Sequence, residues 1–157
     1  GHELIPIAKE IEHAESYLQI QKYRYKNQFT YEFDVDPECL EYLCNKITLQ
    51  PIIENAINHG LDLLVDEGNI HVSVHQDGDD IVFRVEDNGV GMSEEQIQAI
   101  MERGPKDRTG IGIKNVNDRL KIYFGKKYGL HITSELDVGT CVEIRMPKVR
   151  EGDYEAK

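Results

Sequence analysis

Asp87-Asn88-Gly89-Val90-Gly91-Met92 is the stretch that most constrains the fold and the chemistry of this chain. It follows an alternating run from Ile81 to Glu86 that predicts a half-buried strand, and it precedes Ser93-Glu94-Glu95-Gln96, which has the pattern of a helix capping box. An acidic side chain is therefore expected at a strand end, beside a backbone that glycine allows to approach a ligand closely. Asp-x-Gly-x-Gly also occurs in hairpins and calcium loops, but the EF-hand spacing and its terminal glutamate are absent.

A polar-faced helix is expected upstream, starting near Leu49 with Pro51 in its first turn. Ile52, Ile53, Ala56 and Ile57 form its apolar side, and the opposite side carries Glu54, Asn55, Asn58 and His59. A solvated face is one interpretation, but asparagine is a poor helix former, which favours a functional role. Asn55 is the best Mg²⁺ ligand, whereas Asn58 and His59 are placed to reach phosphate oxygens. Glu54 either polarises an attacking hydroxyl or imidazole, or faces solvent.

A second glycine-rich turn, Thr109-Gly110-Ile111-Gly112, opens a helix expected over residues 112–124. The first turn of a helix offers free N–H groups and a positive dipole end to phosphates. The preceding loop carries Arg103, Lys106 and Arg108, and is either a mobile lid over a nucleotide or a solvated loop. Together the three blocks predict an ATP site in which Asp87 accepts a hydrogen bond from the adenine amino group.

The remaining pattern predicts an α/β two-layer sandwich, with helices packed on one mixed, mainly antiparallel sheet. A capped helix is expected through about Ile100, and residues 39–48 are ambiguous. The other expected elements are a helix over about residues 7–25, strands over 29–35, 70–75 and 81–86 with a turn at 77–80, and strands over 129–135 and 140–146. Walker, Rossmann and protein-kinase motifs are absent, which excludes those ATP-binding classes.

The composition suits one reduced, intracellular domain of 157 residues. With 18 basic and 29 acidic side chains the formal net charge is −11, which disfavours attraction to nucleic acid or anionic lipid. Cys39, Cys44 and Cys141 lack metal-ligand spacing and are interpreted as small core residues. There is no apolar stretch long enough to span a bilayer, so any membrane link would come from other parts of a parent chain.

The three blocks resemble the N, G1 and G2 boxes of the Bergerat ATP-binding fold, shared by gyrase, chaperone, histidine-kinase and MutL proteins. The segments Tyr17–Tyr25, Leu49–Gly60 and Gly110–Leu120 are similar to those of LytS/YesM-type bacterial sensor histidine kinases. This resemblance covers about residues 5–148, and it places Thr140 near adenine and Glu54 as the catalytic candidate, with Asn55 holding Mg²⁺. The ATP-binding residues that it implies are Asn55, Asn58, His59, Asp87, Gly89, Gly91, Met92, Arg108, Gly110, Ile111, Gly112 and Thr140.

The resemblance implies that the domain transfers the γ-phosphoryl group of Mg-ATP to a histidine on a dimerisation helix, from which a response regulator takes it. It also implies a homodimeric parent kinase, a cytoplasmic location, and three segments: a helical linker over 1–28, the ATP-binding domain over 29–149 and a frayed tail over 150–157. Pro51 stands where many relatives carry a carboxylate or amide, which leaves the general base open. The alternatives are an ATP hydrolase of the same superfamily and a nucleotide-binding interaction module without turnover.

Overall fold

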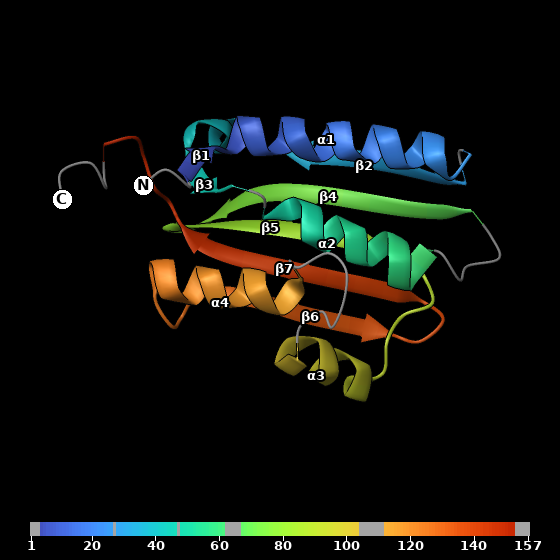
Figure 1. Cartoon of the computed structure of the whole chain (residues 1–157). Coiled ribbons are helices and arrows are strands. Elements are labelled where there is room, and N and C mark those ends of the chain that lie inside the picture. The colour runs from blue at the N-terminus through green and yellow to red at the C-terminus, as the bar shows by residue number, and fades with distance from the viewer. Residues whose placement is uncertain (1–3, 27, 47, 62–66, 104–111, 153–157) are drawn as a thin grey trace.

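The computed structural model describes residues 4–26, 28–46, 48–61, 67–103 and 112–152, and it excludes the side chains of His59 and Arg103. The chain in these ranges folds as two layers, which confirms the expected α/β sandwich (Figure 1). The described strands are β1 (Leu4–Pro6), β2 (Phe29–Val35), β3 (Leu43–Asn45), β4 (Gly68–Asp77), β5 (Asp80–Asp87), β6 (Gly129–Glu135) and β7 (Gly139–Pro147). The described helices are α1 (Ile7–Arg24), a 3₁₀ helix η1 (Pro37–Glu41), α2 (Leu49–Asn55), a π-helical turn η2 (Ala56–Leu61), α3 (Glu94–Arg103) and α4 (Ile113–Phe124).

The main sheet has the strand order β2-β4-β5-β7-β6. Only the β2–β4 pair within it is parallel, and the three other pairs are antiparallel, as the sequence pattern predicts. A parallel pair needs a crossover connection, and α2 lies in the connection between these two strands. Figure 1 shows α2 in front of the middle strands of the sheet.

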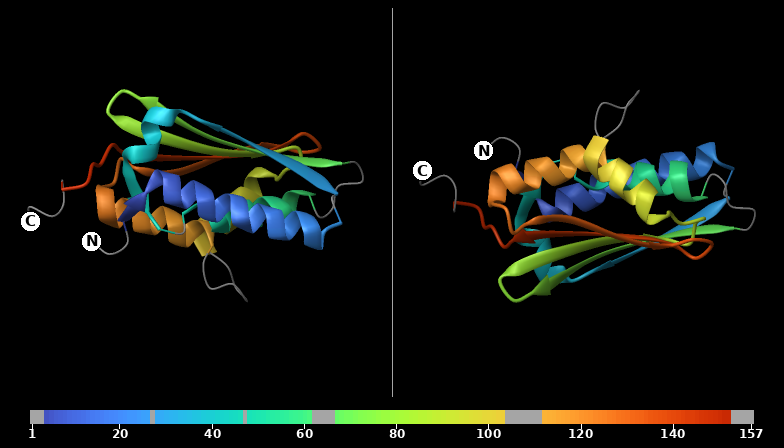
Figure 2. Two further views of the ribbon diagram at one scale, coloured as in Figure 1. Left: turned by 90° about the horizontal axis from the view of Figure 1, so that it is seen from above. Right: turned by 90° about the horizontal axis from the view of Figure 1, so that it is seen from below.

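Helices α1 to α4 lie on the same side of the main sheet (Figure 2). The expected capping box at the start of α3 is formed, because Ser93 N donates to Gln96 Oε1 at 2.8 Å and Gln96 N donates to Ser93 Oγ at 3.2 Å. Helix α4 ends at Gly125, whose φ of 113° is open to glycine and unfavourable for other residues. Within the described ranges, none of the helices combines the length and apolar character that crossing a bilayer requires.

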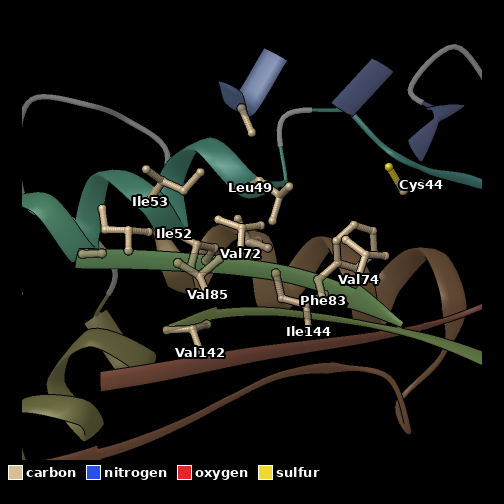
Figure 3. Close-up of a cluster of buried hydrophobic side chains, with 14 of the residues drawn as sticks. Cys44, Leu49, Ile52, Ile53, Val72, Val74, Phe83, Val85, Val142 and Ile144 are labelled. Atoms are coloured by element: carbon tan, nitrogen blue, oxygen red, sulfur yellow. The ribbon is translucent and has the colours of Figure 1, made fainter. Parts of the chain in front are cut away.

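The core fills the space between the helices and one face of the sheet. Buried residues alternate along β4 and β5, so that Val72, Val74, Phe83 and Val85 point toward the helices. Leu49 and Ile52 on α2 point down onto them (Figure 3). This packing fixes the height and direction of α2 above β4 and β5, and β5 ends at Asp87.

The structure defines one segment that the sequence left open and corrects one interpretation. The segment over residues 39–48, which the pattern left ambiguous, contributes η1 and the strand β3, and β3 pairs antiparallel with β1 in a separate two-stranded sheet. Cys39 and Cys44 are buried, as expected, but Cys141 is partly exposed, so its interpretation as a core residue is wrong. Cys141 alternates with the buried Thr140 and Val142 on β7 and therefore lies on the open face of the sheet.

Candidate functional site

Asp87 is the last residue of β5, where it faces the helix layer. Its side chain follows the alternation of Phe83 and Val85, both of which are buried beneath the helices. On either side it is paired with Ile70 of β4 and Thr140 of β7, so two neighbouring strands flank it. The strand end therefore presents a carboxylate below the helices rather than on the open face of the sheet.

The carboxyl group of Asp87 is only partly solvated. Desolvation by burial raises its pKa from an ordinary 3.8 to about 6, while the backbone N–H groups of Gly89 and Thr140 act in the opposite direction. The Gly89 N–H donates to Asp87 Oδ1 at 2.8 Å. The hydrogen bond holds Oδ1 of Asp87 within the turn. A further hydrogen-bond donor, such as one from a ligand, would stabilise the ionised form of this poorly solvated carboxylate.

Two glycines allow the backbone around Asp87 to pack unusually closely. Gly91 has φ of 77°, and a Cβ there would lie 2.2 Å from the Glu135 carbonyl oxygen. Gly139 has φ of 147°, and a Cβ there would lie 2.0 Å from the carbonyl oxygen of Asp87 itself. Gly91 and Gly139 both have positive φ and both approach main-chain atoms of the other segment closely. The turn after Asp87 therefore packs directly against the β6–β7 hairpin. Gly91 belongs to the predicted nucleotide-binding motif, whereas Gly139 lies outside it.

A hydroxyl network continues from this turn into β6 and β7. Met92 N donates to Ser134 Oγ at 2.7 Å, and Ser134 Oγ donates to the Gly139 carbonyl at 2.9 Å. Ser134 Oγ also lies 2.8 Å from Thr140 Oγ1. Since the single proton of Ser134 is directed at Gly139, Thr140 donates in that contact and its lone pairs remain as acceptors. Ser134 was missed by the sequence analysis because a serine on an alternating strand carries no distinguishing signal.

The amide-bearing helix ends above the same edge of the sheet. Leu61, at the end of η2, packs against Gly68 of β4, so closely that a Cβ on Gly68 would lie 2.7 Å from the Leu61 side chain. The turn η2 also contacts β5 and β7. Asn55 is partly exposed at the junction where α-helical geometry gives way to a π-helical turn, a feature that often marks functional sites. Asn58 is exposed, and the side chain of His59 lies outside the described part of the structure.

Glu54, the residue before Asn55, does not simply face solvent. It is partly exposed, and its Oε2 accepts a hydrogen bond of 3.2 Å from the hydroxyl of Tyr17 on α1. The carboxylate is thus held from a second helix, next to the candidate Mg²⁺ ligand.

The start of α4 supplies backbone donors. Gly112 is its N-cap residue, in extended conformation and without a side-chain cap, so the N–H groups of the first turn are available to a phosphate. Arg108, Gly110 and Ile111 lie outside the described residues, as does the rest of the predicted lid after Arg103.

Asn55 offers an amide oxygen, rather than a carboxylate, to a metal ion. No group of three or more His, Cys, Asp or Glu side chains suited to a metal is found among the described residues. Mg²⁺ commonly takes one or two protein oxygens together with phosphate oxygens and water, and the Asn55 amide fits that donor set. A hollow at this end of β5 is lined by Asn69, His71, Glu86, Asp87 and Asn88, and its lining includes no residue of α2. His71 and Glu86 alternate with the buried Val72 and Val85, so this part of the lining lies on the open face of the sheet.

Comparisons with known proteins agree on one family. The model of the family described as "Histidine kinase-, DNA gyrase B-, and HSP90-like ATPase" matches residues 44–150. Sensor histidine kinase BtsS of Escherichia coli is 33% identical over 145 residues, covering 92% of this chain and 24% of BtsS. Sensor protein LytS of Bacillus cereus is 33% identical over 147 residues, covering 92% of this chain and 25% of LytS. The chain therefore spans about a quarter of the length of these curated relatives.

Solved structures with the same fold include the catalytic domain of histidine kinase ThkA. Its TM-score is 0.67 at 15% identity, with 94% of this chain and 97% of that chain covered. A second ThkA structure, in complex with response regulator protein TrrA, gives a TM-score of 0.66 at 15% identity and covers 95% of this chain and 42% of that chain. At these identities the likeness establishes the fold.

Proposed function

Because this chain belongs to the family of histidine kinase-, DNA gyrase B- and HSP90-like ATPases, we propose that it is the Mg-ATP-binding catalytic domain of a sensor histidine kinase. Its membership confirms the resemblance seen in the three sequence blocks. The observation that carries the proposal is the desolvated carboxylate of Asp87, at a strand end below the helix that bears Asn55. A nucleotide would lie between α2, the Asp87 turn and the start of α4.

Each part of the site has a role in this proposal. Asp87 accepts a hydrogen bond from the adenine amino group, and Thr140 adds a hydroxyl acceptor beside it. The backbone at Gly89, Gly91 and Met92 shapes the adenine side of the site. Gly112, together with Gly110, Ile111 and Arg108 in the lid, is assigned to the phosphates, as are Asn58 and His59.

Asn55 would hold Mg²⁺, which when bound neutralises charge on the phosphate oxygens during phosphoryl transfer. In the transfer step, a bond forms between an acceptor imidazole nitrogen and the γ-phosphorus while the bond from that phosphorus to the β–γ bridging oxygen breaks. ADP leaves with the electron pair, and Glu54 is the candidate to receive the proton of the other imidazole nitrogen. The residues of the chain thus position the reactants and accept a proton, as phosphoryl transfer requires.

The acceptor histidine and its partners are placed outside this chain. We assign the acceptor to dimerisation helices of a homodimeric parent kinase, to which residues 1–28 would connect as a helical linker, and the next phosphoryl acceptor to a response regulator. The ThkA complex with a response regulator supports this type of partner. A cytoplasmic location, where ATP is available, follows from the same assignment.

An ATP hydrolase is the second candidate. It would need a water-activating group, but the family position for that group is occupied by Pro51, which is buried and has no titratable side chain. This favours transfer to histidine over hydrolysis. A binding module without turnover differs from both in producing neither phosphorylated acceptor nor free phosphate.

The test is to mix the chain with a separately expressed acceptor segment of the parent kinase and γ-labelled Mg-ATP. Acid-labile label on the acceptor is expected, and much less should appear when Asp87→Asn replaces the wild type at the same low ATP concentration. Release of free phosphate without labelled acceptor would favour the hydrolase, and neither product would favour the binding module.

A further inference from the structure

Helix α1 contacts α2 at two points that lie two turns apart on α1. At the first, Glu10 Oε2 accepts hydrogen bonds from Thr48 N at 2.6 Å and Leu49 N at 2.8 Å. Glu10 is only 2% exposed, and Thr48 has no side-chain cap of its own because its hydroxyl donates to the Asn45 carbonyl. The carboxylate therefore satisfies N–H groups at the start of α2, where negative charge is also favoured by the helix dipole.

The second contact is the hydrogen bond from Tyr17 to Glu54. Tyr17 lies seven residues after Glu10, which brings it to the same side of α1. Burial, followed by the charge and hydrogen bond of Glu54, raises the pKa of Tyr17, so its hydroxyl keeps its proton and donates. Within the described part of the chain, no hydrogen bond reaches the other carboxylate oxygen, Oε1.

We propose that Tyr17 is a positioning residue for phosphoryl transfer, which holds Oε2 of Glu54 so that Oε1 is directed to the proton of the acceptor imidazole. The proposal rests on the proposed function, in which Glu54 accepts that proton as the phosphorus–nitrogen bond forms and ADP leaves. Since the Glu10 contacts fix the start of α2 to the same face of α1, the two helices hold the carboxylate as one unit. A general base acts only when it is aligned with the proton that it accepts, and the Tyr17 hydroxyl would keep the Glu54 carboxylate in that alignment.

The experiment compares Tyr17→Phe with Tyr23→Phe in the transfer assay, using the wild-type chain and the acceptor segment. Tyr23 lies on the same helix with 86% of its side chain exposed, so its substitution controls for the loss of one hydroxyl from α1. General acid–base assistance contributes about 10²–10⁴-fold, and losing the alignment of the base forfeits part of this, so we expect Tyr17→Phe to lower kcat about tenfold. The KM for ATP should be unchanged, and Tyr23→Phe should match the wild type.

A double-mutant comparison separates positioning from a structural role. In a Glu54→Gln background, adding Tyr17→Phe should have no further effect on the transfer rate, because the group that it positions is already gone. Equal rates for Tyr17→Phe and wild type, additive losses in the double variant, or loss of Mg-ATP binding in Tyr17→Phe would each overturn the proposal. Failure of the wild-type chain to label the acceptor would instead overturn the proposed function on which it rests.

Discussion

Replacing Asp87 by asparagine should stabilise the nucleotide-free domain at neutral and alkaline pH, although Asp87 is assigned to the binding site. The folded-state pKa of this carboxyl lies at about 6, above its ordinary value of 3.8. The folded state therefore binds the proton more tightly than the unfolded state, and stability falls as the pH rises from 3.8 through about 6. Above this range the domain carries an ionised, poorly solvated carboxylate.

The magnitude follows from the pKa difference. One pKa unit corresponds to about 1.4 kcal/mol, so a rise from 3.8 to about 6 corresponds to about 3 kcal/mol of lost stability when Asp87 is ionised. Asparagine stays neutral and can still accept the Gly89 N–H through its amide oxygen. Since the site is partly solvated and the amide is itself polar, we expect a gain of about 1–3 kcal/mol at about pH 8.

Urea unfolding followed by circular dichroism, at about pH 8 and about pH 4, measures this difference. The gain from Asp87→Asn should be present at the higher pH and shrink toward zero at the lower one. Asp79→Asn, in the exposed β4–β5 turn, is the matched control and should change stability by no more than about 0.5 kcal/mol at either pH. A less stable Asp87→Asn at about pH 8, or a gain independent of pH, would refute the assignment of Asp87 as a desolvated carboxylate.

Three further substitutions test the support of the site, two by thermal or urea unfolding and one by calorimetry. Gly91→Ala should lower the free energy of unfolding by more than about 2 kcal/mol, because the added Cβ would lie 2.2 Å from the Glu135 carbonyl oxygen. The control Gly78→Ala, which also has positive φ but open space around it, should lower it by only about 1 kcal/mol. Equal losses in the two variants would refute the close approach at Gly91. Glu10→Ala should cost about 1–3 kcal/mol by leaving two N–H groups at the start of α2 without their acceptor, and an equally large loss in the exposed Glu15→Ala would contradict this reasoning. Ser134→Ala should weaken Mg-ATP binding in calorimetry, because it removes the acceptor of Met92 N and the neighbour of Thr140; unchanged affinity would remove the hydroxyl network from the site.

Local patterns were sufficient to predict most of the fold. The apolar stripe after Pro6 predicted α1, which runs from Ile7 to Arg24, and the alternating runs around residues 77–80 predicted the β4–β5 hairpin. These elements can be predicted because the residues that define them, the periodic apolar positions and the turn residues, lie within the elements themselves. The pairing of β1 with β3 could not be predicted, since strands of three residues have too little alternation to recognise and their partner is distant in sequence.

The site was predicted where its residues carry an unusual local signal, and missed where they depend on distant partners. Asp87 and Asn55 stand out because an acid beside glycines and an amide within a helix are both costly choices without a role. Glu10, in contrast, carries no local signal of a helix cap, because its hydrogen-bond partners Thr48 and Leu49 lie 38 and 39 positions away in the sequence. The hydrogen bond from Tyr17 to Glu54, whose positions differ by 37 in the sequence, is of the same kind.

The central claim, that the carboxylate of Asp87 recognises the adenine of ATP, is tested most directly by calorimetric titration of Mg-ATP into wild type, Asp87→Asn and Asp79→Asn. We expect Asp87→Asn to lose about 1–3 kcal/mol of binding free energy, which is about a 5- to 150-fold rise in Kd, while Asp79→Asn binds as the wild type does. Equal Kd values for Mg-ATP in the wild type and Asp87→Asn would contradict the account.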